Sequence, residues 1–318
     1  MKTALIIALI ALVVGALILG IGWVLLQKNP IDKNVFKDKV YPFGIDELPN
    51  RIDISTINGR VEFRTIQGDE WRVECKDTEK VYHTVELVDG ALIIKQIDTR
   101  AWYEYIGIFT NLRPQSVIVY LPEGNYGTIN IQSTSGGISV PEGFTFSDVT
   151  LKSTSGSISF ASPAAGAMNV RNTSGSITVS GNVGGDLNAK NTSGDIRIIG
   201  GVNGALNVTN GSGRIEIKDA TPRKAEIKNT SGAIYLQNVV CQEECEIENT
   251  SGGIELKRCD AASFDIENTS GGIRGSILSA KTFDCKTTSG SVRTPADGNG
   301  GTFKAKTTSG SIKITIAE

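Results

Sequence analysis

The dominant feature of the chain is the dipeptide Ser-Gly, which recurs ten times between residues 134 and 310. Eight of these copies read Thr-Ser-Gly-x-Ile, and successive glycines are separated by 19 or 20 residues. A fixed period of this length is typical of a repeat protein in which each repeat is one supersecondary unit. The recurring glycines are Gly136, Gly156, Gly175, Gly194, Gly213, Gly232, Gly252, Gly271, Gly290 and Gly310.

Apolar residues keep fixed positions relative to each glycine. Every repeat carries an apolar pair seven and five residues before the glycine, and Ile or Val two residues after it. Apolar residues two apart indicate a strand with one buried face, so each repeat predicts a strand, a Ser-Gly corner and a second strand. Because no repeat can bury its apolar face alone, the repeats must stack, with equivalent strands parallel and about 4.8 Å apart.

The geometry of a tight corner explains why Gly, Ser, Thr and Asn recur there. Glycine permits a positive φ or a close approach of two backbones, and the preceding Ser and Thr can hydrogen-bond to the backbone as it turns. Six repeats carry Asn three residues before the glycine, and we expect these amides to stack into a side-chain ladder along the rod. They are Asn172, Asn191, Asn210, Asn229, Asn249 and Asn268. The ten glycines are therefore predicted to be structural corners.

These patterns predict an all-β protein, a single-stranded parallel β-solenoid of 19–20-residue coils preceded by one transmembrane α-helix. Residues 126–318 are expected to form the regular solenoid. Residues 43–125 keep strand patterns without the glycine repeat, so we expect degenerate coils or a cap there, since terminal repeats are often atypical. Residues 28–42 are polar and predict a short stalk. Outward strand positions of mixed charge, such as Glu226 and Lys228, are expected to be solvated.

The N-terminal segment predicts a membrane anchor. Residues 3–27 carry no charge and are long enough to cross a bilayer, so residues 1–27 are expected to be an uncleaved anchor. The alternative is a cleaved signal peptide, although the apolar run is long for one and no Ala-x-Ala site follows it. Lysines after the anchor favour a cytoplasmic solenoid. The signal-like start and the Ser/Thr/Asn/Gly-rich remainder favour export, and we expect a single-pass protein with an extracytoplasmic solenoid.

Two segments interrupt or end the repeat and are candidates for interaction. The insertion at residues 97–115 gathers Trp102, Tyr103, Tyr105 and Phe109. These rings either contact a membrane or a glycan, or fold over the mouth of the solenoid and are buried. The last strand pattern, at residues 312–316, has no cap after it, and an unprotected edge invites self-association through the C-terminal coil.

The sequence offers no catalytic residues, cofactor site or metal site. The single histidine, His83, lies on a predicted strand and is expected to be a surface or packing residue. The corner serine recurs ten times, whereas nucleophiles are singular, and the common catalytic motifs are absent. A net charge of −2 gives no footprint for nucleic acid. The sequence therefore predicts a protein that is not an enzyme.

The five cysteines, Cys75 included, do not make a disulfide framework. Cys245 and Cys285 occupy inward positions two repeats apart, which is too far for a bridge. Cys241 and Cys259 fall at turn positions of adjacent repeats, so a disulfide between them stays open.

The Asn-Thr-Ser-Gly-x-Ile repeat, together with Val-Tyr-Leu-Pro-Glu-Gly at residues 119–124, resembles the bacterial "putative adhesin" family of β-strand repeats, which has no known function. With its N-terminal anchor the chain is similar to the LiaG-like membrane proteins of Gram-positive bacteria, associated with cell-envelope stress operons. The resemblance covers about residues 45–318.

The resemblance implies an anchored, non-enzymatic envelope protein. It would present a rigid solenoid for adhesion or scaffolding, in contact with cell-wall glycan or envelope proteins. One alternative is an accessory modulator of a membrane sensor kinase or transporter. Another is a carbohydrate-active β-helix, which would need acidic and basic residues clustered on one face of adjacent coils.

Overall fold

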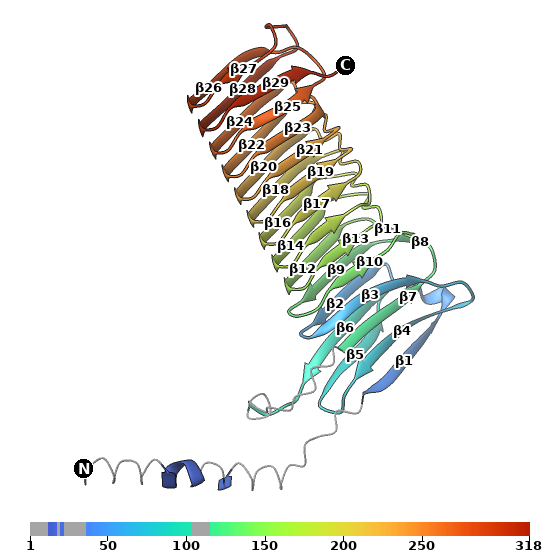
Figure 1. Cartoon of the computed structure of the whole chain (residues 1–318). Helices are drawn as coiled ribbons and strands as arrows, with labels where there is room; N and C mark the ends of the chain where they lie inside the picture. The colour runs from blue at the N-terminus through green and yellow to red at the C-terminus, as the bar shows by residue number, and fades with distance from the viewer. Residues whose placement is uncertain (1–11, 18–19, 22–35, 103–114) are drawn as a thin grey trace, which may run out of the picture.

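The computed structural model describes residues 12–17, 20–21, 36–102 and 115–318. Strands stacked across the long axis build a rod, with the C-terminus near one end and β1 (Lys37–Gly44) at the other (Figure 1). The described strands form a 14-stranded sheet, here sheet A, and a 13-stranded sheet, here sheet B. Because the stacked coils run parallel from β9 onward, the predicted parallel β-solenoid is confirmed.

Each regular coil contributes one strand to each sheet, with the Ser-Gly corner between them. The longer strands form sheet B: β9 (Thr128–Ser133), β12 (Val149–Ser155), β14 (Met168–Ser174), β16 (Leu187–Ser193), β18 (Ala205–Ser212), β20 (Lys224–Ser231), β22 (Glu244–Ser251) and β24 (Ser263–Ser270). The shorter strands form sheet A: β10 (Ile138–Val140), β13 (Ile158–Phe160), β15 (Ile177–Val179), β17 (Ile196–Ile199), β19 (Ile215–Lys218), β21 (Ile234–Gln237), β23 (Ile254–Cys259) and β25 (Ile273–Ile277).

The core lies between the two sheets, and a third, shorter side closes each coil. Inward residues of equivalent strands pair in register, as Ile158 does with Ile177, so the apolar repeat becomes continuous columns. On the third side single bridges join Ala164 to Val183 and Val183 to Val202. Nearer the N-terminal end this side is a two-stranded sheet, β8 (Gly124–Tyr126) with β11 (Phe144–Phe146).

The corner glycines are required by both backbone conformation and space. Nine of the ten have φ between +110° and +151°, which side chains rarely adopt, and Gly136 is the exception. A Cβ on any of the ten would come within 2.0–2.6 Å of the carbonyl oxygen of the glycine stacked next to it. The glycines therefore form a column in which backbone contacts backbone.

The corner asparagines are buried and stack in register along the rod, as predicted, but their side-chain amides bond to backbone carbonyls and not to one another. In each case Nδ2 donates to a glycine carbonyl of the preceding corner, as from Asn210 to Gly194 O at 3.0 Å. The same bond recurs for Asn172, Asn191, Asn229, Asn249 and Asn268. The glycine turn leaves this carbonyl pointing along the rod axis, where the amide of the next coil satisfies it.

At the N-terminal end the stacking order departs from the chain order. The strands are β2 (Arg51–Thr56), β3 (Gly59–Thr65), β4 (Glu70–Asp77), β5 (Val81–Val88), β6 (Ala91–Asp98) and β7 (Gln115–Leu121), and η1 (Ile45–Glu47) precedes β2. The β2–β3 coil lies between the β9–β10 coil and the later β6–β7 coil. Outside them β4, β5 and β1 run antiparallel, which makes an antiparallel cap rather than further coils.

The outermost cap strand has features that protect an edge. β1 carries Lys37, Lys39 and Pro42, residue types that blunt pairing with another chain. The predicted stalk, residues 28–42, overlaps this cap, because its last six residues belong to β1.

The C-terminal end is also non-sequential. The last strands, β28 (Thr302–Ser309) and β29 (Ile312–Ile316), insert between the β24–β25 coil and the coil of β26 (Thr282–Ser289) and β27 (Val292–Arg293). The edge expected to be open at residues 312–316 is covered only in part, since β27 pairs with Ile312 and Lys313 and no described strand pairs with residues 314–316 on that side. Asp297, in the loop after β27, accepts a hydrogen bond from the backbone of Phe283 on β26 at 3.0 Å and covers part of the edge of that strand.

The predicted anchor is mostly outside the described residues. Residues 12–17 and 20–21 are helical, and the remainder of 1–27 is not described. Searching the described ranges finds no helix with the length and apolar character needed to span a bilayer.

Candidate functional site

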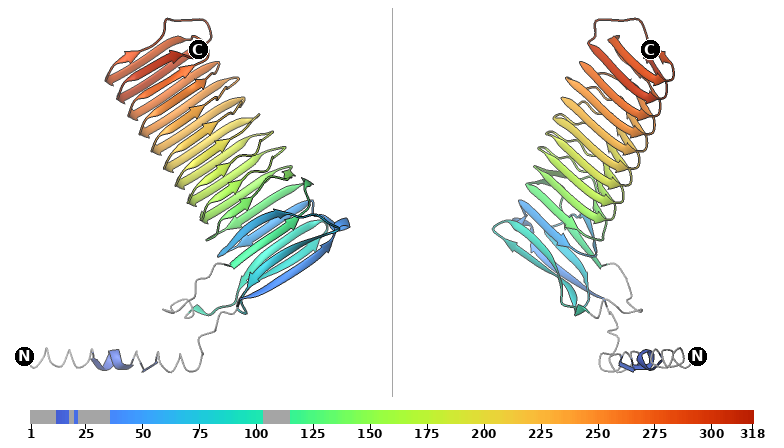
Figure 2. Two further views of the ribbon diagram at one scale, coloured as in Figure 1. Left: turned by 45° about the vertical axis from the view of Figure 1, so that its right-hand side comes forward. Right: turned by 90° about the vertical axis from the view of Figure 1, so that its left-hand side faces the viewer.

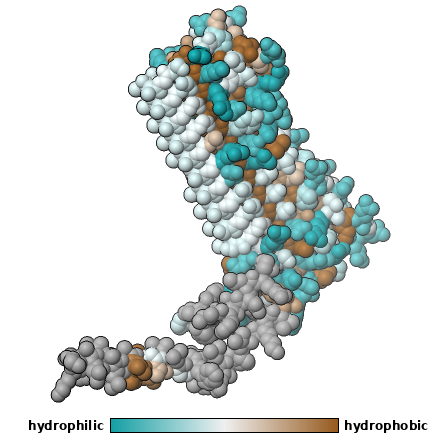
Figure 3. All heavy atoms as spheres, in the orientation of Figure 1, coloured by the Kyte–Doolittle hydropathy of each residue, from teal (hydrophilic) through white to brown (hydrophobic). Residues whose placement is uncertain are grey.

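The most regular surface of the molecule is the outer face of sheet B. On each strand the residues six, four and two positions before the corner glycine point outward, and in-register pairing turns them into three rows along the rod. The row beside the corner consists almost entirely of exposed threonines. Figure 3 shows a pale band of intermediate hydropathy along the side of the rod where these strands end. The row beside the corner is therefore a line of hydroxyl-bearing side chains.

Two shallow grooves run along this face. The N-terminal groove is lined by the side chains of Lys152, Arg171 and Lys190 and by Thr154, Thr173 and Thr192. The C-terminal groove is lined by Lys228, Glu248, Glu267 and Lys306 and by the threonines of the same coils. Both grooves lie between the middle row and the threonine row, so they are two stretches of one architectural feature.

Charged side chains in and beside the C-terminal groove form ion pairs with one another. Nζ of Lys228 lies 3.0 Å from a carboxylate oxygen of Glu226, 3.2 Å from Glu248 and 3.7 Å from Glu246. Hydrogen bonds to Glu226 and Glu248 raise the pKa of Lys228. Burial, and then the adjacent Glu248, raise the pKa of Glu246. This is a cluster of acidic and basic residues on adjacent coils, which the sequence analysis did not find.

Charges in the N-terminal groove are not neutralised by the fold. Lys152 pairs in register with Arg171, and Arg171 with Lys190, so three cations stand about 4.8 Å apart on adjacent strands. None of the three has an ion pair or side-chain hydrogen bond within the described part of the chain. Like charges directly opposite one another are destabilising in a sheet. We call Lys152, Arg171 and Lys190 the cation row.

The neighbours of the cation row are uncharged on every side within sheet B. Thr154, Thr173 and Thr192 flank it toward the corner, and Thr150, Asn169 and Asn188 flank it on the other side. Gln132 and Thr209 continue the row at its two ends. Reading the position four before each glycine as a column would have found this row in the sequence.

The aromatic insertion lies between β6 and β7. Trp102 is 75 % exposed. Tyr103, Tyr105 and Phe109 lie outside the described residues, so whether they contact a ligand or cover the solenoid stays a prediction.

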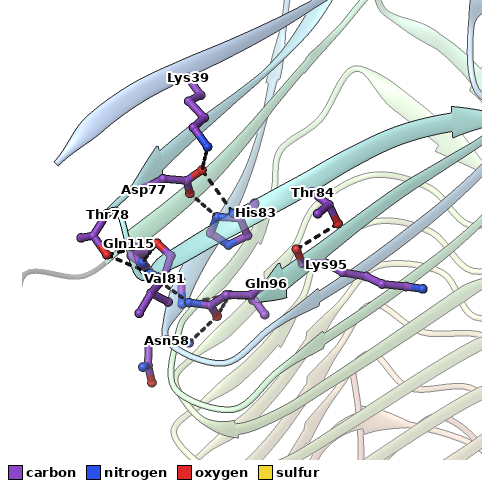
Figure 4. Close-up of polar contacts among 12 residues, drawn as sticks. Lys39, Asn58, Asp77, Thr78, Val81, His83, Thr84, Lys95, Gln96 and Gln115 are labelled. Carbon is purple, nitrogen blue, oxygen red and sulfur yellow. Dashed lines mark hydrogen bonds and ion pairs between the residues drawn. The ribbon is translucent and has the colours of Figure 1, made fainter. Parts of the chain in front are cut away.

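Next to that insertion the structure brings together a polar cluster that the sequence did not predict (Figure 4). His83 was expected to be a surface or packing residue; it is buried, at 1 % exposed, and its Nδ1 lies 2.6 Å from Oδ1 of Asp77. Lys39 approaches Asp77 Oδ2 at 3.5 Å from β1. Six residues separate His83 from Asp77, and the turn between β4 and β5 makes them neighbours.

Two glutamines complete this cluster and replace a corner. Gln96 stands where regular coils carry the corner asparagine, and its Oε1 accepts hydrogen bonds from Thr56 Oγ1 and from the backbone of Ile57 and Asn58. Its Nε2 donates to Gln115, whose own amide donates to Val81 O at 2.8 Å. The cluster therefore ties the cap to the first corner. His83 and Asp77 are both closed to solvent, so the pair has no access to a substrate.

The cysteines are free and belong to the interior. The open possibility of a bridge between Cys241 and Cys259 is not realised, since both are free and buried. A hydrogen bond with Cys241 and burial raise the pKa of Cys245, and burial raises the pKa of Cys259 to about 11. These thiols stay protonated at neutral pH. Cys245 and Cys285 are three rungs apart rather than two, because β28 intervenes.

No group of three His, Cys, Asp or Glu side chains that could hold a metal ion occurs in residues 36–102 and 115–318 or the short N-terminal stretches that the structure describes. Chemically, the arrangement offers two different surfaces on one face, a cation row without ion partners and three carboxylates gathered around Lys228.

Comparison with solved structures finds bacterial proteins of related shape. One, described as a "putative adhesin" from Bacteroides fragilis, is 12 % identical with a TM-score of 0.40, over 88 % of this chain and 97 % of that one. A "putative lipid binding protein" from Parabacteroides distasonis is 14 % identical with a TM-score of 0.39, over 88 % and 97 %. A further "putative adhesin" from Parabacteroides distasonis is 10 % identical with a TM-score of 0.40, over 89 % and 98 %.

No curated protein matches the chain. The profile of the Toastrack DUF4097 family matches residues 49–236 and 202–318, which together span most of the sequence and all of the regular coils. The family-level resemblance drawn from the Ser-Gly repeat is thereby confirmed. The chain belongs to the Toastrack DUF4097 family.

Proposed function

We propose that this chain is a non-enzymatic binding protein of the bacterial cell envelope, which presents the outer face of sheet B to an extended partner. The observation that carries the proposal is the in-register array on that face. Exposed threonines and the cation row repeat at the strand spacing along a rigid rod. An array of this kind complements a partner that is itself linear and periodic, such as a cell-wall glycan.

Several features support a binding role over catalysis. The corner serines are fixed in the turn beside the glycine column, and the buried His83–Asp77 pair is closed to solvent. The cluster around Lys228 does meet the condition set for a carbohydrate-active β-helix, acidic and basic residues on adjacent coils. Its side chains are 38–49 % exposed and held in ion pairs, whereas catalytic carboxylates work in sites that exclude water.

We further propose that residues 1–27 tether the rod to the cell membrane and that the rod faces outward. The uncharged run of residues 3–27 supports the tether. A rod held at one end would place its outer face at a distance from the bilayer. A role as accessory to a membrane sensor is the second candidate, favoured by the exposure of Trp102 at 75 %.

Cosedimentation of the full chain, in mild detergent, with purified bacterial cell-wall sacculi tests the proposal. Thr173→Tyr places a bulky ring in the N-terminal groove and should reduce the bound fraction at least fivefold. Ser159→Tyr, on the exposed face of sheet A, is the matched control and should bind as the native chain does. Equal binding by all three proteins, or no binding by the native chain, would contradict the proposal. Loss of binding on Trp102→Ala alone would place the contact at the aromatic insertion instead of sheet B and would also contradict the proposal.

A further inference from the structure

We infer that the N-terminal groove is a binding site for a linear anionic polysaccharide, whose acidic groups lie over the cation row while its hydroxyls bond to the flanking threonines and amides. This deepens the proposed function, on which it rests, by naming the chemistry of the ligand and the residues that receive it.

The positive charge of the cation row has no counter-charge nearby in sheet B. Three cations in register repel one another, and the uncharged residues around them give no compensation. Elsewhere on the same face the chain does compensate, since Lys228 lies within 4 Å of three carboxylates. An anionic partner would remove the repulsion in the cation row and gain the attraction of all three side chains at once.

The direction of the groove indicates a linear ligand. The cation row follows the stacking direction, so its charges recur about every 4.8 Å along the rod. The groove has the same direction, with its lining residues drawn from five successive rungs, β2, β9, β12, β14 and β16. A linear polymer with an acidic group on each unit or each second unit can therefore contact several rungs together. Multivalent contact of this kind raises affinity without requiring a deep pocket.

The lining of the groove favours a glycan over a nucleic acid. The groove is lined by Ser, Thr, Asn, Gln, Lys and Arg side chains, with Ile57 as its single apolar residue. No aromatic ring lies among the lining residues to stack a base, which is how single-stranded nucleic acids are held without sequence preference. Rows of hydroxyls and amides are instead suited to the hydroxyl groups of a sugar chain.

The test measures binding of polygalacturonate to the full chain in mild detergent by isothermal titration calorimetry at two salt concentrations. The triple variant Lys152→Gln, Arg171→Gln, Lys190→Gln should lose at least 30-fold in affinity, and its binding should be less sensitive to salt. The matched control, Lys257→Gln, Arg293→Gln, Lys313→Gln, removes the same charge from sheet A and should bind as the native chain does.

Unchanged affinity in the first triple variant would overturn the inference, as would equal binding of fully methyl-esterified polygalacturonate. Tighter binding of single-stranded DNA than of polygalacturonate would overturn the glycan assignment. Folding is checked by the melting temperature of the free variant, which should be no lower than that of the native chain because repulsion has been removed. If sacculi binding is blocked by Thr173→Tyr while polygalacturonate does not bind, the proposed function stands and this inference fails.

Discussion

The two grooves on sheet B occupy equivalent positions in the repeat but treat charge in opposite ways. Around Arg171 the outward residues six positions before the glycine are uncharged, whereas around Lys228 they are Glu226 and Glu246. The backbone, corner and inward residues are the same in kind in both regions. The difference teaches that the solenoid decides where side chains stand, and that outward residues, free of packing constraints, decide what each stretch of the face can bind.

The largest effect should come from the corner glycines, and it should be equal in both regions. Gly175→Ala and Gly252→Ala each place a Cβ at a φ of +110° or +120° and within 2.6 or 2.3 Å of a glycine carbonyl oxygen. We expect a loss of about 3 kcal/mol in unfolding free energy, measured by urea denaturation. Gly253→Ala, whose added Cβ has 3.7 Å to its nearest neighbour, is the control and should be tolerated. A mild effect at only one corner would show that the scaffold differs between the regions.

Removing a corner asparagine should have the next largest effect. Asn172→Ala and Asn249→Ala each leave a glycine carbonyl of the preceding corner without its donor. Because that carbonyl lies inside the stack, we expect a cost of about 1–2 kcal/mol in either region, seen as a lower urea midpoint. Asn169→Ala, on the outward side of the same strand as Asn172, should cost much less. Similar losses for Asn169 and Asn172 would argue against the glycine bond as the reason.

Single neutral substitutions should separate the two grooves by the sign of their effect. Lys228→Gln leaves Glu226, Glu246 and Glu248 facing one another and should lower the melting temperature. Arg171→Gln relieves repulsion from Lys152 and Lys190 and should raise it by about 1 °C. Thermal melts of both variants at low salt measure this. Destabilisation by both would mean that Arg171 has a partner that balances its charge.

The smallest effect is a pH dependence confined to the C-terminal groove. The pKa of Lys228 is raised above its ordinary 10.5 by Glu226 and Glu248, so its stabilising contribution is complete below pH 10.5 and is lost as pH rises through the folded value. The stability difference between the native chain and Lys228→Gln should therefore shrink above pH 10.5, as followed by chemical denaturation from pH 7 to 12. A difference that stays constant across that range would contradict the ion-pair account.

Much of the fold could be predicted because each repeat specifies both its buried positions and its corner. The apolar positions define the inward faces, and the glycine defines the corner, so any other arrangement would expose one or clash at the other. Within residues 43–125, where degenerate coils or a cap were expected, Ile52, Ile54 and Val61 form one coil and pair with Ile129, Ile131 and Ile138.

The candidate site was less predictable. The mixed outward charges were expected to be solvated, and they are exposed. Their partners lie on neighbouring coils, so they appear only when equivalent positions of successive repeats are compared. The pairing of His83 with Asp77 likewise depends on the turn between β4 and β5. The chain passes there from sheet A to sheet B and brings the two side chains together. In both cases the missing information was which side chains face each other.

The sequence alone determined that this protein is a stacked parallel solenoid with glycine corners, because nearly every repeat carries the same inward apolar positions and the same corner glycine. The order of the end coils was decided only by the tertiary structure (Figure 2). The β28–β29 coil supplies Phe303, Ala305, Ile312 and Ile314 to the core and lies inside. The β26–β27 coil has Thr294 and Pro295 where the last inward residue should be, so it covers the end, since Pro cannot pair within a central strand. The burial gained by each coil, rather than its place in the chain, set its place in the rod.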